Sequence, residues 1–408
     1  LQPQLRLIIC AAVAAGALTV YLREVGPGNL TPAAVDPALA LMWGVGGACA
    51  LGAAWQAKYH RLSALMLMGV TGLVVCVTFV WFSAPDLALT QLLVEIVTTV
   101  LLLLGLRWLP KRFETAETRQ QDVITVGRRT VDLTIAVAAG AGMAGLAFAV
   151  MTRMPPDLLA QHFLARAYTE GGGTNVVNVI LVDFRGFDTL GEITVLAAVA
   201  LTAFALLRRL RPALDSIEVP EQQLDQRATE IAHPNRDVGD IVSDWLMLPW
   251  LVSRLLFPVI AIVALFLLFR GHDLPGGGFA AGLTASIAII VQYMMGGTSW
   301  IEARLRVLPL RWMGAGLLFA AGTGLGAWFF GYPFLTSYFS YLYVPVIGQV
   351  PAASALLFDI GVFLLVVGAV VLILIALAHQ SVRGHRAVPR AVPNREKVAT
   401  PEPEKGEA

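Results

Sequence analysis

An acidic residue lies within a long apolar stretch, where a carboxylate could hold a proton or bind a cation. Nearly every residue over 87–109 is apolar, and Glu95 lies near the middle of this range. On a helix, Gln91, Thr98 and Thr99 share the face of Glu95, so the acid belongs to a polar stripe. A carboxylate at the centre of a bilayer costs about 2.5–3.5 kcal/mol on insertion scales, so it requires a partner, water or a proton. Glu95 therefore either forms a hydrogen bond to a neighbouring helix or takes part in moving protons or cations.

Three more acids surround the start of another apolar stretch. Asp188 and Glu192 are four residues apart and stack on one helix face, while Asp183 and Arg185 precede them. Neighbouring carboxylates repel each other unless a cation, a proton or an arginine intervenes, so these acids are candidates for ion translocation. The simpler alternative is an ion pair between Asp183 and Arg185, with Asp188 capping the helix and Glu192 completing its first turn.

The second half of the chain adds one acid inside an apolar stretch and a glycine-rich turn. Asp359 lies about 12 Å along the last apolar stretch at the rise of a helix, and a structural hydrogen bond or an ion route would each explain it. Gly278 and Gly282 have the spacing that lets two membrane helices pack closely. His272 and Asp273 precede them and could titrate or bind a cation, although an exposed loop pair is the simpler interpretation.

Composition places these residues in a helical membrane protein. The chain is 57% hydrophobic and 14% charged, with a mean hydropathy of +0.71, which is too apolar for a soluble domain. A net charge of +1 provides no basic face for a nucleic acid. The three cysteines lack metal-ligand spacing, so no metal and no cofactor are expected.

Ten apolar windows are long enough to cross a bilayer and predict an all-α polytopic fold. All but five of the 29 lysines and arginines fall on one side of these windows. The positive-inside rule makes that side cytoplasmic, and ten spans place both termini there. The five exceptions are Arg23, Arg153, Arg166, Arg185 and Arg270. The ten windows are residues 5–22, 37–57, 62–82, 87–109, 130–151, 188–207, 250–269, 279–296, 309–330 and 351–378.

The charged segment after the sixth window divides the chain. We expect a six-helix membrane domain over 1–210, a cytoplasmic linker over 211–244, a four-helix membrane domain over 245–380 and a disordered cytoplasmic tail over 381–408. Residues 331–350 contain no charge and many aromatic side chains, as expected of an outer segment near the lipid headgroups. Residues 157–170 could form a short interfacial helix on the same side.

Three segments carry a resemblance to a known family. Residues 83–95, Ser-Ala-Pro-Asp-Leu-Ala-Leu-Thr-Gln-Leu-Leu-Val-Glu, resemble the C-terminal part of the large A subunit of Mrp-type (Mnh-type) multisubunit cation/proton antiporters. Residues 173–195 resemble the end of the same subunit, and 271–283 resemble the signature of the B subunit. The whole chain thus resembles the tail of an A subunit joined to a B subunit, a family related to the membrane modules of energy-converting hydrogenases.

The resemblance implies a membrane component of a multisubunit sodium/proton antiporter in the bacterial inner membrane, and not an enzyme. Its partners would be the other subunits of the complex and membrane lipids, and its transported ions Na⁺ and H⁺. The ion-translocation candidates would be Glu95, Gln91, Thr98, Glu192, Asp188, Asp183 and Asp359.

Two alternatives remain beside the antiporter. The large antiporter-like core of the A subunit is not covered and no apolar window contains a lysine, so the chain alone should not exchange ions. The chain could instead belong to a sodium-translocating module of a hydrogenase-type complex. It could also be a passive scaffold between antiporter modules, with its acids merely structural.

Overall fold

Ten helices long and apolar enough to cross a membrane appear in a computed structural model of the chain, among the residues that it describes. The described residues are 3–22, 26, 28–30, 34–57, 60–106, 122–154, 159–209, 244–296, 298, 301–302, 308–345 and 348–386. The all-α prediction is confirmed. The ten helices are α1 (Pro3–Leu22), α2 (Pro37–Gln56), α3 (Arg61–Trp81), α4 (Pro85–Leu106), α5 (Asp122–Met151), α8 (Gly186–Arg209), α10 (Asp244–Arg270), α11 (Gly277–Gly296), α13 (Pro309–Phe329) and α14 (Ala355–Arg386).

Local sequence explains where several of these helices begin. The Asp36 side chain accepts hydrogen bonds from the backbone N–H groups of Ala38 and Leu39, at 2.8 and 3.4 Å, and so caps α2. Proline is the first residue of α2, α4 and α13. The N–H group at this position has no partner within a helix, so proline, which lacks it, loses no hydrogen bond there.

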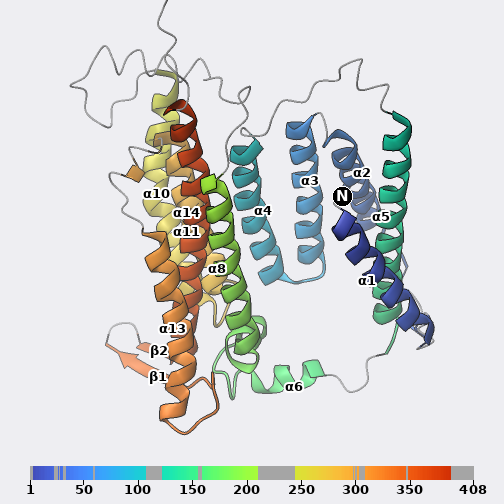
Figure 1. Cartoon of the computed structure of the whole chain (residues 1–408). Helices are drawn as coiled ribbons and strands as arrows, with labels where there is room; N and C mark the ends of the chain where they lie inside the picture. The colour runs from blue at the N-terminus through green and yellow to red at the C-terminus, as the bar shows by residue number, and fades with distance from the viewer. Residues whose placement is uncertain are drawn as a thin grey trace, which may run out of the picture.

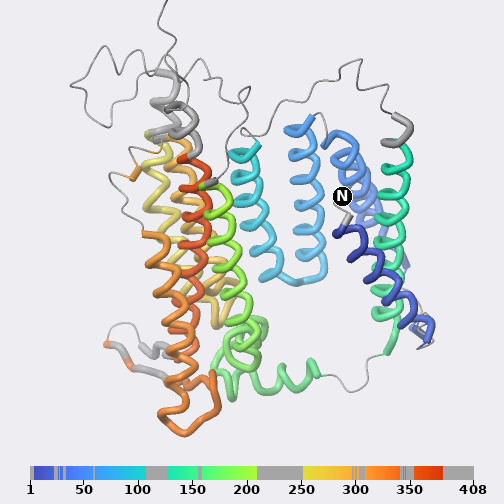
Figure 2. The backbone as a smooth tube through the Cα atoms, viewed as in Figure 1, coloured from blue at the N-terminus to red at the C-terminus, as the bar shows by residue number. Residues whose placement is uncertain are grey.

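The shorter elements lie at one end of the helices. Helix α6 (Leu159–Arg166) confirms the predicted short helix and runs across that end in Figure 2. Next come α7 (Val176–Val179) and a π-helix, η2 (Ile180–Phe184). Strands β1 (Phe339–Val344) and β2 (Gly348–Ala353) form an antiparallel hairpin within and just beyond the predicted outer loop. The hairpin was not predicted, and it explains why α14 begins at Ala355 rather than at residue 351.

The C-terminal helices form a packed bundle around α14. Helices α13, α11 and α8 pack directly on α14, and α10 packs on α11 (Figure 1). A Cβ on Gly278 would overlap the Asp359 carbonyl group, and one on Gly282 would lie 2.8 Å from Val366. The predicted close helix packing through Gly278 and Gly282 is therefore confirmed.

The N-terminal helices are arranged more loosely. Helices α2, α3 and α4 pack in sequence, and α4 contacts α11 and α14. Helix α1 packs against α5, away from the C-terminal bundle (Figure 1).

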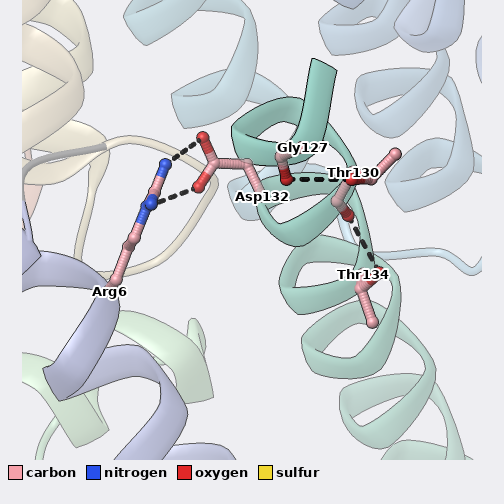
Figure 3. A network of polar contacts seen from close by, with 5 residues as sticks. All are labelled: Arg6, Gly127, Thr130, Asp132 and Thr134. Atoms are coloured by element: carbon pink, nitrogen blue, oxygen red, sulfur yellow. Dashed lines mark hydrogen bonds and ion pairs between the residues drawn. The ribbon is translucent and has the colours of Figure 1, made fainter. Parts of the chain in front are cut away.

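The α1–α5 pair is joined at both ends. At one end Arg6 forms a two-pronged ion pair with Asp132, with Nε–Oδ1 2.7 Å and Nη2–Oδ2 2.8 Å (Figure 3). At the other, the backbone N–H groups of Gly28 and Leu30 bond to the Thr152 hydroxyl and carbonyl.

The helices alternate in direction, so α6 and the hairpin lie at the same end (Figure 1). Which end faces the cytoplasm remains a prediction. Residues 210–243, most of the predicted linker, and 387–408, most of the predicted tail, lie outside the described residues. Helix α14 continues to Arg386, beyond the predicted end of its window at residue 378.

Candidate functional site

Glu95 lies halfway along α4, about 15 Å from either end at the rise of a helix. Its carboxyl group turns toward α3, where it occupies the space that a side chain at Gly72 would fill. It also forms a hydrogen bond with the hydroxyl of Thr99, one helical turn later. The acid is thus half-buried in the seam between two helices, at the depth that the sequence predicted.

The predicted polar stripe around Glu95 is only partly assembled. Gln91 is half-buried, whereas Thr98 is exposed. Thr99 contacts the acid, and Thr98 does not. The exposed side of the stripe faces away from α3, where a partner helix, lipid or water would meet it.

A second polar cluster joins the two halves of the chain near the start of α4. The Asn175 side-chain amide donates to Asp86 Oδ1 and to the carbonyl oxygens of Gly271 and Leu274, each at 3.1 Å. The backbone N–H of Gly276 also donates to Asp86 Oδ1, at 3.3 Å. We call these residues the Asn175 junction, because one buried amide links α4, the segment before α7 and the glycine-rich turn.

Asp359 lies beside this junction and is buried. Its carboxylate accepts hydrogen bonds from the Gly278 N–H at 3.1 Å and the Asn178 amide at 3.4 Å. These contacts are compatible with a structural hydrogen bond, because they hold the carboxylate in place. They are equally compatible with an ion route, because they surround the carboxylate with hydrogen-bond donors.

Asp183 lies in the π-helix η2, and its Oδ1 accepts a hydrogen bond from the Ser337 N–H at 3.3 Å. Burial raises the pKa of the Asp183 carboxyl; bonds from Ser337 and the electrostatic effect of His272 act in the opposite direction. The same histidine acts electrostatically on Asp359.

His272 and Asp273 are not a simple exposed loop pair. The His272 Nε2 lies 2.8 Å from the Gly171 carbonyl oxygen. The Thr174 N–H donates to Asp273 Oδ1 at 3.2 Å, and its hydroxyl donates to the Asp273 carbonyl oxygen at 2.8 Å. Both residues therefore help to attach the glycine-rich turn to the segment before α7.

Asp188 and Glu192 lie apart from both clusters. Both are exposed on α8. Asp188 forms an ion pair with Arg185 in the first turn of the helix, so the simpler alternative of an Asp183–Arg185 pair is wrong. Within the described residues Glu192 has no hydrogen bond or ion pair, and any role for it depends on what covers this face of α8.

The sequence singled out the acids but missed the groups that hold them. Gly72, Asn175, Asn178 and Asp86 were not predicted. Asp86 and Asn175 lie within the segments that carry the family resemblance, which was the available signal. No sequence signal indicates the contact between Gly72 and Glu95, because it joins two helices whose relative register cannot be read from the sequence. Within the described residues no three His, Cys, Asp or Glu side chains gather as metal ligands.

Three family models match the chain in succession. Residues 45–111 match MbhD and residues 127–224 match MbhE, which are models of the D and E subunits of MBH. Residues 249–372 match MnhB, described as "Domain related to MnhB subunit of Na+/H+ antiporter".

Relatives show the same succession within antiporter subunits. A protein of Rhizobium meliloti (strain 1021), described as the A/B subunit of a probable K(+)/H(+) antiporter, is 61% identical over 96% of this chain, which spans only 39% of that relative. The A subunit of the Na(+)/H(+) antiporter of Bacillus subtilis (strain 168) is 40% identical over 36% of the chain and 18% of the relative. The B subunit from the same organism is 39% identical over 28% of the chain and 81% of the relative.

A solved structure agrees with this succession. The structure of the Mrp complex from Dietzia sp. DQ12-45-1b contains a chain with a TM-score of 0.72 and 28% identity, covering 93% of this chain and 38% of that one. With ten apolar helices in the part of the chain that the structure describes, the protein is a multi-pass bacterial membrane protein. It belongs to the Mrp-type antiporter family, in which it corresponds to the C-terminal part of an A subunit joined to a B subunit.

Proposed function

We propose that the chain is a membrane subunit of a multisubunit monovalent cation/proton antiporter, and that Glu95 is its principal ion-translocating residue. The observation that carries the proposal is a carboxylate halfway through α4 with a hydroxyl as its described side-chain partner. A group without a fixed counter-charge can exchange a proton for a cation as its surroundings change, which a purely structural acid does not need to do.

The proposal also concerns which cation is transported. The sequence resemblance predicted Na⁺, and the Bacillus relatives are described as Na(+)/H(+) antiporter subunits. K⁺ is the second candidate, because the relative that matches 96% of the chain is described as part of a probable K(+)/H(+) antiporter. Both ions therefore belong in any test.

The remaining acids have supporting roles in the proposal. Asp359 and Asp183 would exchange ions or protons at the end of the helices where α6 and the hairpin lie, with His272 acting electrostatically on each. Asp188 and Glu192 would act only where a partner subunit covers their exposed face of α8. Gln91 and Thr98 would provide neutral oxygen atoms along the same helix face as Glu95.

The test is cation-dependent collapse of a proton gradient in everted vesicles that contain the full complex, with Na⁺ and K⁺ added separately. Glu95→Gln keeps the size and hydrogen bonding of the side chain and removes its charge. We expect it to abolish exchange or reduce it by about 10²-fold or more, with normal subunit content. Asp36→Asn is the control, because that exposed acid caps α2 and asparagine caps a helix equally well. Wild-type exchange by an assembled Glu95→Gln complex would return Glu95 to a structural role.

A passive scaffold and a hydrogenase-type module make different predictions. A scaffold tolerates amide replacements at all of the acids, so parallel tests of Asp359→Asn and Glu95→Gln separate it from a conduit. A hydrogenase-type module would purify with an iron–sulfur or nickel protein, and an antiporter complex would not.

The predicted domains and orientation complete the proposal. The chain would contribute a six-helix and a four-helix membrane domain, linked on the cytoplasmic side, and would work only beside the other subunits. The single substitutions Ser340→Cys and Thr400→Cys, in a background without the native three cysteines, test the orientation in sealed cells. Labelling of the Ser340→Cys variant with protection of the Thr400→Cys variant is expected, and the reverse pattern would overturn the topology.

A further inference from the structure

At Gly72 the three atoms nearest to an added Cβ all belong to a carboxyl group, which distinguishes this contact from the other close glycine contacts among the described residues. A Cβ built on Gly72 would have as its three nearest atoms Oε2, Cδ and Oε1 of Glu95, the farthest of them at 2.9 Å. No backbone atom is among these three. The space that a side chain would fill at position 72 is therefore occupied by the carboxyl group itself.

Gly316, which serves helix packing, shows a different pattern. At Gly316 of α13 the nearest atoms are the Gly361 carbonyl oxygen at 2.6 Å and the Leu365 N–H nitrogen at 2.7 Å, both in the backbone of α14. A side chain there would force two helices apart. At Gly72 it would instead displace the far end of one flexible side chain, so this glycine sets where an acid lies rather than how closely two helices approach.

We propose that Gly72 is a positioning residue for Glu95, which keeps the carboxyl group in the α3–α4 seam and within reach of the Thr99 hydroxyl. The inference rests on the proposed role of Glu95. With any larger residue at position 72, the carboxyl group rotates out of the seam toward the exposed side of α4. It then has a different set of partners, and the pH at which it exchanges its proton changes with them.

The chain contains a matched control one helical turn away. A Cβ on Gly69 would lie 3.7 Å from Glu95 Oε1, which is an ordinary van der Waals distance. Gly69→Ala and Gly72→Ala therefore make the same chemical change on the same helix beside the same acid, but only the second displaces the carboxyl group. Gly44→Ala on α2 is a further control, because nothing lies within 4 Å of that position.

The first experiment measures the pH profile of antiport in vesicles that contain the full complex, normalised to subunit content. We expect Gly72→Ala to move the pH of half-maximal exchange by roughly one unit, and Gly69→Ala and Gly44→Ala to leave it unchanged. Glu95→Asp shortens the acid by one methylene and relieves the overlap, so the double variant Gly72→Ala/Glu95→Asp should have the pH profile of Glu95→Asp alone. Equal effects of Gly72→Ala and Gly69→Ala, or a Gly72→Ala loss that only follows reduced assembly, would overturn the inference.

The second experiment does not depend on transport. A hydrophobic carbodiimide reacts with a protonated carboxyl group in the membrane, and mass spectrometry measures its modification of Glu95 in the intact complex. Gly72→Ala should change the rate of modification severalfold, and Gly69→Ala should not. If Glu95→Gln exchanges ions normally, the proposed function fails, yet the modification rates still decide whether Gly72 positions the acid. Equal rates in the two glycine variants would show that it does not.

Discussion

The C-terminal half contains the two most buried membrane helices of the described residues and the N-terminal half the three least buried ones, although the helices of both halves are similarly apolar. In the C-terminal half, 72% of the most apolar window of α14 and 61% of that of α11 are buried, against 0% in α1 and 6% in α2 and in α5. The mean hydropathy of α1 is nevertheless higher than that of α11, at 2.1 against 1.6. Hydropathy thus reports that a helix can enter a bilayer and says little about which helix has neighbours. In lipid, close packing and hydrogen bonds decide association, because apolar side chains are equally well surrounded by acyl chains.

The surroundings of the glycines show the same difference in helix packing. Gly316 and Gly361 bring the backbones of α13 and α14 together, whereas Gly16 on α1 and Gly142 on α5 have nothing within 4 Å. An open apolar groove of about 1030 Å³ lies between α1 and α5, and Gly16 and Gly142 line it. The C-terminal bundle is expected to be stable by itself, and the α1–α5 pair is expected to gain stability from neighbours.

Substitution of a packed glycine should have the largest effect. Gly316→Ala places a methyl group against the backbone of α14, and we expect a loss of about 1–3 kcal/mol in the free energy of unfolding. Gly142→Ala should be neutral in the purified chain. Thermal unfolding in detergent, followed by size-exclusion chromatography, measures both. Equal losses would remove the contrast between the two halves.

The Asn175 junction should come next. Asn175→Ala removes the donor shared by the Gly271 and Leu274 carbonyl oxygens and Asp86, which keeps its bond from the Gly276 N–H, and leaving polar groups of a buried site unsatisfied costs about 1–3 kcal/mol. The loss should appear as weaker association when residues 1–226 and 227–408 are expressed as two chains and one is affinity-purified. Asn175→Asp tests the donor itself, because it keeps the shape of the side chain. Full recovery of both chains with Asn175→Ala would mean that helix packing alone holds the halves together.

The Arg6–Asp132 ion pair should contribute less. Both side chains are partly exposed, at 22% and 28%, so solvent screens the pair. A double-mutant cycle of Arg6→Gln and Asp132→Asn should give a coupling energy of about 1 kcal/mol in the purified chain. If the stability losses of Arg6→Gln and Asp132→Asn simply add in the double variant, the two side chains do not form a stabilising pair.

The pH dependence of Asp183 should be the smallest effect. Burial raises its pKa, so the stability that this group contributes is present below its unfolded pKa and is lost as the pH rises through the folded pKa. The wild-type chain should therefore lose stability relative to Asp183→Asn as the pH rises from acid toward neutral. Melting temperatures across that interval provide the measurement, with Asp188→Asn as an exposed control. A constant difference between wild type and Asp183→Asn would contradict the raised pKa.

Features set within one helix were predictable, and features set between helices were not. The ten helices, the depth of Glu95 and the Gly278–Gly282 packing surface follow from hydropathy and spacing along one helix. The Gly72–Glu95 contact and the bonds of Asp359 to Gly278 and Asn178 depend on the register of segments far apart in sequence. The hairpin after Phe339 was missed because its aromatic side chains also suit a membrane interface, which gives the same composition.

The Asn175 junction lies near the start of α4, whereas α8 ends and α10 begins at the opposite end of the helices (Figure 1). Besides helix packing and other hydrogen bonds, the two halves are therefore joined both by peptide bonds and by the amide of Asn175. A covalent tether turns the docking of one half on the other into an intramolecular step, with an effective concentration that reaches the millimolar range for short flexible linkers. Mutations that loosen the junction are thus buffered in the fused chain, whereas relatives that make the A and B subunits as separate proteins have no such buffer. The fused chain therefore has more freedom to vary at this surface.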